Sequence, residues 1–270
     1  MNSMMQTAKV YISEKIGTGY EVGIILGTGL SNFVDYVKDK IVIPYDEIPG
    51  FVKSTAPSHK GNLIAGTINR KKVIVLQGRF HFYEGYSLEQ VVFPTRVLKL
   101  LGVHTLIVTN AAGSLREEFV PGGIIMLKDH INFFGNNPLI GANDDSLGER
   151  FVSLHDTYCE EYRSKMKLIS LNNKIKISEG VYIGVTGPSF ETKAECQFFA
   201  NIGADVVGMS TVPEVIAAVH CGLKVLAFSI VTNYSNLIHK TRHSQEEIRE
   251  NADIAKSNLE KLVSDFIKEI

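Results

Sequence analysis

The sequence has almost no net charge and no long apolar run. Lysine and arginine number 28 against 29 acidic residues, which leaves a formal net charge of −1. Because no basic cluster follows a helical face, we expect neither nucleic acid nor an anionic membrane surface as a partner. Residues 1–15 mix polar and charged side chains with apolar ones, and no apolar stretch long enough to span a membrane follows. We therefore expect no signal peptide, no membrane anchor and no transmembrane helix.

Cysteine is also scarce. The three cysteines, Cys159, Cys196 and Cys221, are odd in number and widely spaced. This spacing argues against a disulfide framework and against a Cys-x-x-Cys metal site, and a reducing cytoplasm is the compartment we expect. The sequence also lacks a nucleophilic serine elbow, a Walker phosphate loop and a His-Glu-x-x-His zinc motif. Serine hydrolase, nucleoside triphosphatase and metalloenzyme activities are therefore disfavoured.

What the sequence does contain is the pattern of an α/β protein. Hydrophobic residues make up 44% and charged residues 21%, as in ordinary globular proteins, and we expect one domain spanning residues 1–270. Apolar, β-branched runs predict strands, and helical periodicity predicts helices between them. The predicted strands are 21–26, 63–68, 73–76, 105–109, 180–185, 205–209 and 224–232, and the predicted helices are 87–101, 156–171, 192–202, 212–221 and 244–270.

Three local features complete the fold prediction. Asn69-Arg70 should form a tight turn between antiparallel strands, whereas the later strands alternate with helices, so the central sheet should be mixed and flanked by helices. Pro94 lies inside a predicted helix and should kink or restart it. The stretch 129–150 is rich in glycine and asparagine and has little periodicity. Long loops of this kind in compact domains are usually functional.

Ligands of open α/β sheets bind beyond the carboxyl ends of the strands, and the first such ends are polar here. Thr28 stands between Gly27 and Gly29, where the backbone and the hydroxyl can approach an anion. Farther along, strand alternation places Arg79, His81 and Tyr83 on one face. An arginine fork beside an imidazole would make a phosphate clamp, because charge-assisted hydrogen bonds are strong.

The later strand ends are polar as well. The small residues 110–114 expose backbone amides that can bind an oxyanion. Phe190 could stack on a planar base while Glu191 accepts N–H groups from its edge. Ser210 stands at the start of a helix, where a hydroxyl suits an anion. Asn233 ends the last strand with an amide that both donates and accepts hydrogen bonds.

Each of these features also has an ordinary structural explanation. Glu191 would be a favourable acid in a first helical turn, and Ser210 could simply cap a helix. Asn233 would be a common turn residue, and isolated histidines such as His59 and His243 usually lie on the surface. The balance shifts because five strand ends carry complementary polar groups together, which favours a binding site.

Taken in order along the chain, segments 77–85, 108–113, 187–196 and 203–222 closely resemble the trimeric, low-molecular-mass purine nucleoside phosphorylases. The resemblance covers essentially the whole chain. It implies a pentosyltransferase of purine salvage that cleaves 6-oxopurine (deoxy)ribonucleosides, such as inosine and guanosine, to the free base and (deoxy)ribose 1-phosphate. Inorganic phosphate is then the co-substrate, no metal or organic cofactor is needed, and the assembly is a homotrimer.

The resemblance also implies a role for each candidate residue. The catalytic residues would be His81, Glu191 and Asn233, and Thr28 keeps the hydroxyl of the serine that many relatives carry there. The phosphate site would comprise Thr28, His59, Arg79, His81, Asn110, Ala111 and Ser210. The nucleoside site would comprise Tyr83, Phe190, Glu191, Val207, Met209, Asn233 and His243, with Phe151 entering from the neighbouring subunit.

Three other functions remain to be weighed. A methylthioadenosine phosphorylase has the same fold and resembles this family, but it carries an aspartate at the position of Asn233. Asn233 and Glu191 together therefore argue against it. A dehydrogenase is weakened because Asn32 stands where a dinucleotide-binding fingerprint needs its third glycine. A non-catalytic nucleoside- or sugar-phosphate-binding protein would share the same pocket residues. Phosphate-dependent release of hypoxanthine from inosine separates an enzyme from such a binder.

Overall fold

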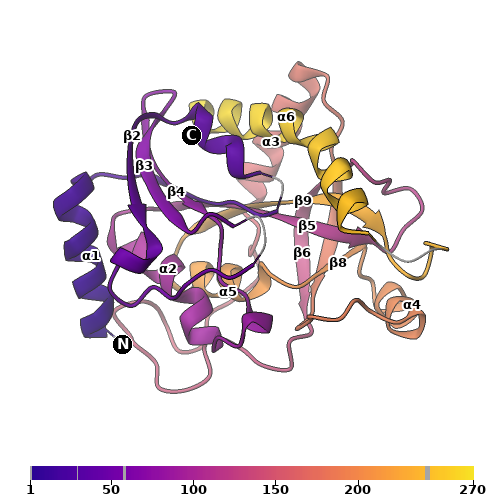
Figure 1. Cartoon of the computed structure of the whole chain (residues 1–270), viewed down its shortest axis with the longest axis horizontal. Helices are drawn as coiled ribbons and strands as arrows, with labels where there is room; N and C mark the ends of the chain where they lie inside the picture. The colour runs from indigo at the N-terminus through magenta and orange to yellow at the C-terminus, as the bar shows by residue number, and fades with distance from the viewer. Residues whose placement is uncertain (1, 29, 57–58, 241–243) are drawn as a thin grey trace.

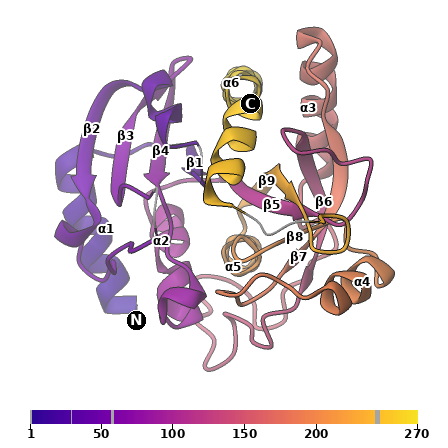
Figure 2. The ribbon, with the colours of Figure 1, turned by 45° about the vertical axis from the view of Figure 1, so that its right-hand side comes forward.

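A nine-stranded mixed sheet forms the centre of the molecule within the described residues, which a computed structural model gives as 2–28, 30–56, 59–240 and 244–270. The strands are β1 (Val22–Ile25), β2 (Lys38–Pro44), β3 (Asn62–Ile68), β4 (Lys71–Gln77), β5 (Thr105–Ser114), β6 (Ile124–Asn132), β7 (Ser178–Gly184), β8 (Val206–Gly208) and β9 (Lys224–Tyr234). Their order is β2-β3-β4-β1-β5-β8-β7-β6-β9, and β5 also pairs with β9. The last five strands in this order therefore close into a ring, from which β1, β4, β3 and β2 extend as an open arm (Figures 1 and 2).

The strands at the junction of the ring and the arm run parallel. Strand β1 pairs in parallel with both β4 and β5, and β5 pairs in parallel with β9. Their carboxyl ends consequently meet at one edge of the sheet. The hairpin between β3 and β4 turns at Asn69 and Arg70, whose φ angles are 49° and 70°. Two successive positive φ angles are those of the tight hairpin turn that was predicted.

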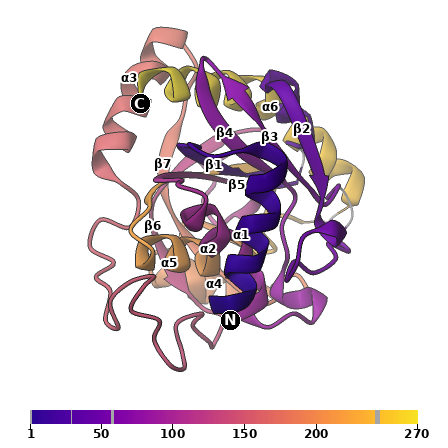
Figure 3. The ribbon, with the colours of Figure 1, turned by 90° about the vertical axis from the view of Figure 1, so that its left-hand side faces the viewer.

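Helices cover both faces of the sheet, as Figures 2 and 3 show. They are α1 (Asn2–Ile16), α2 (Leu88–Leu100), α3 (Glu160–Asn173), α4 (Lys193–Asn201), α5 (Val212–His220) and α6 (Gln245–Glu269). One buried cluster joins α1, α2 and α5 to the sheet, and a second joins α3 and α6 to it. Alternation along β4 serves both clusters, since Ile74 belongs to the first and Val75 to the second. The predicted α/β class, with a mixed sheet between helices, is confirmed.

Three predicted helix starts coincide with capping residues. Ser87, Thr192 and Ser244 each accept a hydrogen bond from the backbone N–H three residues ahead, which satisfies one of the unpaired donors of the first turn. Pro94 was predicted to kink or restart its helix, and the restart is wrong, because α2 is continuous from Leu88 to Leu100. Most side chains of α2 are buried, so tertiary packing holds the helix despite the missing backbone donor.

Helix α1 and strands β2 and β6 are absent from the sequence-based prediction. In α1 the buried residues Met5, Ala8 and Ile12 follow helical spacing, a signal that the sequence did carry. Strand β2 lies at the edge of the sheet with mostly exposed side chains, so its apolar alternation is weak. Strand β6 takes in residues 129–132, and the predicted loop begins only after Asn132. Among the described residues, no helix has the length and apolar character needed to cross a membrane.

Candidate active site

A pocket of about 610 Å³ opens at the edge where β1, β4, β5 and β9 end. This is the position at which ligands bind to open α/β sheets. The predicted residues that line it are Thr28, His59, Arg79, His81, Tyr83, Asn110, Ala111, Phe190, Glu191, Val207, Met209, Ser210 and Asn233. The further lining residues are Gly27, Ala112, Gly113, Pro188, Gly208, Thr232, Ile248 and Arg249.

Two predicted residues are not among those that line the pocket. Phe151 belongs to the long loop, where its side chain is 88% exposed to solvent in the single chain. His243 lies outside the described residues. Conversely, Ile248 and Arg249 of α6 line the pocket and were not predicted. The Ser244 cap does locate the start of α6, but nothing in the sequence shows that this end of the helix reaches the sheet edge.

One end of the pocket carries three stacked rings. The rings of His59 and His81 lie 5.0 Å apart between centroids, and those of His81 and Tyr83 lie 4.5 Å apart. Burial, together with the charges of His81 and Arg79, lowers the pKa of His59 to about 3. His59 is therefore neutral at pH 7 and has a single N–H, not a full charge, to offer an anion.

Glu84 fixes the orientation of His81. Its Oε1 accepts hydrogen bonds from the His81 backbone at 2.8 Å and from the ring Nδ1 at 2.9 Å, and its Oε2 accepts from Thr55. Burial alone would raise the pKa of Glu84, but the hydrogen bonds from His81 and Thr55 outweigh it and lower that pKa to about 2. Because the ionised carboxylate can only accept, Nδ1 of His81 carries a proton and Nε2 is the nitrogen left for a ligand.

Arg79 makes more hydrogen bonds to the protein than a residue that only binds phosphate would make. Its side chain is 3% exposed. One terminal nitrogen donates to Thr211 Oγ1 at 3.0 Å and to Glu214 Oε2 at 3.3 Å, and the other donates to the carbonyls of Ile25 and Thr109. A guanidinium has five N–H donors, so these contacts occupy its terminal ones. Among the described residues, the Nε donor of Arg79 has no partner.

The other end of the pocket combines an aromatic ring with a carboxylate and an amide. Phe190 is 44% exposed, and Glu191, whose pKa is raised by burial, stands beside it. Glu191 precedes the Thr192 cap of α4, so the explanation that it serves as an acid of the first helical turn is wrong. Asn233 is 5% exposed, and its Nδ2 donates to the Tyr234 carbonyl at 3.0 Å.

Backbone without side chains makes room for these groups. A Cβ atom at Gly113 would lie 3.2 Å from Nδ2 of Asn233, and a Cβ at Gly27 would lie 2.5 Å from the Thr109 carbonyl oxygen. Gly27 therefore permits the close approach of the β1 end to β5, and Gly113 leaves space beside the Asn233 amide.

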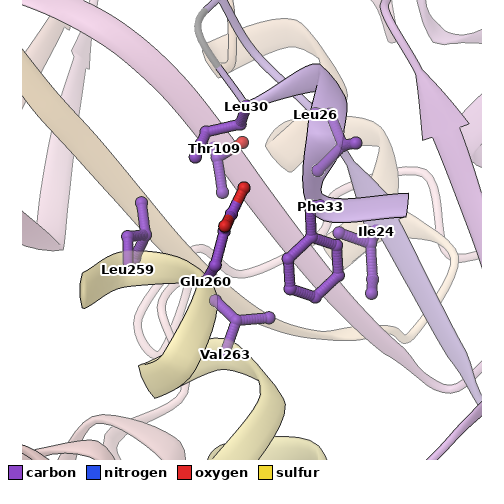
Figure 4. A pocket seen from close by; sticks show the side chains of 8 residues that line it. All are labelled: Ile24, Leu26, Leu30, Phe33, Thr109, Leu259, Glu260 and Val263. Carbon is purple, nitrogen blue, oxygen red and sulfur yellow. The ribbon is translucent and has the colours of Figure 1, made fainter. Parts of the chain in front are cut away.

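A second, much smaller cavity lies behind the strand ends. Its volume of about 10 Å³ is near the minimum for one water molecule, and its walls are Ile24, Leu26, Leu30, Phe33, Thr109, Leu259, Glu260 and Val263. Figure 4 shows the Glu260 carboxyl extending from α6 toward Thr109 and Leu30. Glu260 is 8% exposed, its Oε1 has no partner among the described residues, and burial raises its pKa. The cavity is too small for a nucleoside.

Comparison with known proteins gives consistent matches. Residues 21–268 match the model of a family described as the phosphorylase superfamily. The chain is 43% identical to purine nucleoside phosphorylase 1 of Bacillus subtilis, with 99% of this chain and 98% of the relative covered. It is also similar to solved structures of Schistosoma mansoni purine nucleoside phosphorylase. The complex with inosine has a TM-score of 0.94 at 40% identity and covers 99% of this chain and 96% of that one. The complex with adenosine has a TM-score of 0.94 at 41% identity and covers 100% and 98%.

Proposed function

The chain belongs to the purine nucleoside phosphorylase family, and from this premise we propose that it cleaves purine nucleosides with inorganic phosphate. The products are the free base and (deoxy)ribose 1-phosphate. The observation that carries the proposal is the pocket itself. Its one end presents Arg79, His81 and Ser210 to an anion, and its other end presents an aromatic ring, a carboxylate and an amide to a planar base.

The geometry suggests how the two ends share the reaction. Phosphate bound beside Arg79 and His81 attacks C1′ of the sugar, and the bond from C1′ to the base breaks as the new C–O bond forms. Negative charge then develops on the departing purine, so a donor placed at its N-7 or O-6 lowers the barrier. The amide nitrogen of Asn233 has two N–H groups, of which one bonds the Tyr234 carbonyl. The second is left for the base.

We propose that the preferred substrates are 6-oxopurine nucleosides. Their N-1–H can donate to Glu191, whereas adenine presents a bare N-1 that leaves the ionised carboxylate unpaired. A buried group left without its partner costs about 1–3 kcal/mol, and sites built around such pairs can discriminate by roughly 10⁴-fold or more. Because the Schistosoma mansoni relative has been solved with adenosine as well as inosine, the quantity to compare is turnover rather than binding.

Phe151 supports a homotrimer. Its ring is 88% exposed, and the preceding Arg150 donates to the carbonyls of Leu139 and Gly141 and so anchors the loop that carries it. An anchored, exposed aromatic is suited to enter a neighbouring protomer's pocket and cover the sugar. Light scattering should report a trimer, and Phe151→Ser should raise KM for inosine without changing the mass. A fully active monomer would contradict the assembly.

The three cysteines are free and buried, in keeping with the cytoplasmic location that we propose and that cell fractionation would test.

A nucleoside panel assayed with and without phosphate tests the function as a whole. We expect inosine and guanosine to release their bases only when phosphate is present, and ribose 1-phosphate to accumulate in equal amount. Base release without phosphate would indicate a hydrolase. Nucleoside binding with no base release under either condition would indicate a binding protein.

A further inference from the structure

The turn between β8 and α5 holds a strained threonine. Thr211 has φ 70° and ψ −53°, and the Val212 N–H donates to the Ser210 carbonyl at 2.7 Å. Together these define a γ-turn with positive φ, which is rare and strained. Glycine adopts such a φ freely, whereas a β-branched residue there is an outlier. Strained residues of this kind cluster at functional sites, so the side chain of Thr211 must have a use that glycine could not supply.

That use lies in the hydroxyl group, which is fully buried and outside the pocket wall. Thr211 Oγ1 lies 2.9 Å from Asn110 Nδ2, 3.0 Å from a terminal nitrogen of Arg79 and 3.1 Å from Ser210 Oγ. Each of these three partners lines the pocket, and they come from β5, from the segment after β4 and from the γ-turn itself. One hydroxyl therefore connects three separate pieces of the predicted phosphate site.

Hydrogen-bond accounting fixes the direction of these contacts. A hydroxyl has one proton and two lone pairs, and the nitrogens of Asn110 and Arg79 can only donate. With the Asn110 amide in the orientation seen here, in which Nδ2 faces Thr211 and Oδ1 has no partner among the described residues, both lone pairs of Thr211 Oγ1 are occupied, and its proton points to Ser210 Oγ. The proton of Ser210 is then directed away from Thr211. Because Ser210 lines the pocket, its hydroxyl is left as a donor toward the pocket, which is what an anionic oxygen requires.

We propose that Thr211 is a positioning residue that assembles the phosphate site without touching phosphate, and that it orients Ser210 as a hydrogen-bond donor. This inference rests on the proposed function. Neighbouring contacts hold the turn in place: Glu214 Oε2 accepts the Thr211 N–H at 2.8 Å, and the Tyr182 hydroxyl accepts the Ser210 N–H at 3.2 Å. Both acceptors belong to well-buried side chains.

The test compares Thr211→Val, which keeps the branched shape but loses the hydroxyl, with Thr211→Ser, which keeps the hydroxyl. Inorganic phosphate is titrated into each protein by calorimetry without nucleoside, and inosine is titrated without phosphate. We expect the valine variant to bind phosphate about tenfold or more weakly, because a Ser210 hydroxyl that is no longer oriented loses its charge-assisted hydrogen bond to the anion. The serine variant should stay within about threefold of wild type. Inosine affinity should change little in either. Unchanged phosphate affinity in the valine variant, or equal losses for both ligands, would overturn the proposal.

A double-mutant cycle tests the route through Ser210. If Thr211 acts partly by orienting that hydroxyl, the loss in phosphate affinity for Ser210→Ala with Thr211→Val is smaller than the sum of the two single losses. Additive losses would refute the orientation of Ser210. Should the valine variant fail to fold, Thr211→Gly replaces it, because glycine relieves the strained φ while still lacking the hydroxyl, and it should show the same phosphate defect. Wild-type protein that binds phosphate but turns over no nucleoside would refute the proposed reaction and leave the Thr211 comparison intact; wild-type protein that binds no phosphate would refute both.

Discussion

Replacing Arg79 by alanine should damage stability and phosphate binding by separable mechanisms. The guanidinium lies 3.3 Å from Glu214, and both side chains are 3% exposed. Without its partner, the buried carboxylate of Glu214 is uncompensated, which costs about 3–5 kcal/mol of unfolding free energy. In a protein of this size 1 kcal/mol corresponds to about 2–4 °C in Tm, so Arg79→Ala should lower Tm by roughly 6–20 °C.

Removing both charges separates the effect on phosphate from the effect of an unpaired buried carboxylate. The double variant Arg79→Met with Glu214→Gln keeps the volume of the pair and leaves no unpaired charge, and replacing a whole buried ion pair is often close to neutral in stability. Most of the lost Tm should therefore return. Phosphate affinity should not return, because the lost positive charge beside the anion is worth about as much as a charge-assisted hydrogen bond, about 1.5–3 kcal/mol, or roughly ten- to a hundredfold in KM for phosphate.

Thermal unfolding of the three proteins and phosphate titrations at saturating inosine measure the two effects. KM for inosine at saturating phosphate serves as the control and should change far less. A double variant with the phosphate dependence of wild type would refute the role of Arg79 as an anion-binding group. A double variant that remains as unstable as Arg79→Ala would refute the argument from the unpaired Glu214.

Three further predictions concern titrating and specificity groups. Because the pKa of His59 is lowered to about 3 in the folded protein, the unfolded chain binds the extra proton first as pH falls below about 6.5. The free energy of unfolding of wild type should therefore fall, relative to that of His59→Gln, by up to about 1.4 kcal/mol per pH unit as pH drops from 6.5 to 5. The same dependence of unfolding free energy on pH in both proteins would contradict this. The raised pKa of Glu260 has the opposite effect on stability. Because the folded state holds the Glu260 proton to higher pH than the unfolded chain, the free energy of unfolding falls as pH rises above the ordinary carboxyl pKa of 4.5. Glu260→Gln should stabilise the protein at pH 7 by about 1 kcal/mol, seen as a higher Tm that disappears at pH 4. Asn233→Asp should lower the inosine-to-adenosine ratio of kcat/KM, because a carboxylate repels O-6 yet accepts from a 6-amino group; an unchanged ratio would show that Asn233 does not face the base.

Much of the site could be predicted because its residues stand where strands end. Thr28, Ser210 and Asn233 each follow or finish a buried apolar run. Parallel strands bring Thr28 and Asn233 to one edge, whereas Ser210 reaches the same pocket from β8, which pairs antiparallel with the end of β5. Arg79, His81 and Tyr83 do line one pocket, although the alternation used to group them does not apply, because β4 ends at Gln77. The grouping succeeded through proximity along the chain and not through strand geometry.

The remaining features depend on contacts between segments that lie far apart in sequence. Glu214 lies 135 positions from Arg79, and no local pattern connects the two residues. Thr211 appears in the sequence as one more small polar residue before a helix, and no local pattern marks the φ of 70° that it adopts. Arg249 differs in no visible way from other cations of an amphipathic helix, yet it reaches the pocket.

The position of Asn233 shows how an irregularity in the sheet shapes the base-binding end of the pocket. Ala112 of β5 pairs with Val231 of β9, but the next residue, Gly113, pairs with Asn233, so Thr232 is an extra residue and forms a bulge. A bulge alters the alternation of a strand and re-aims the side chains beside it, which explains how the consecutive residues Thr232 and Asn233 both line the pocket. Gly113 also pairs with Val207 of β8. The closing of β5, β8 and β9 into a ring therefore places Gly113 between Val207 and Asn233, two residues proposed to contact the base. A Cβ atom at position 113 would lie at an ordinary 3.6 Å from Cγ1 of Val207 but at only 3.2 Å from Nδ2 of Asn233, so it is the Asn233 amide that favours glycine there.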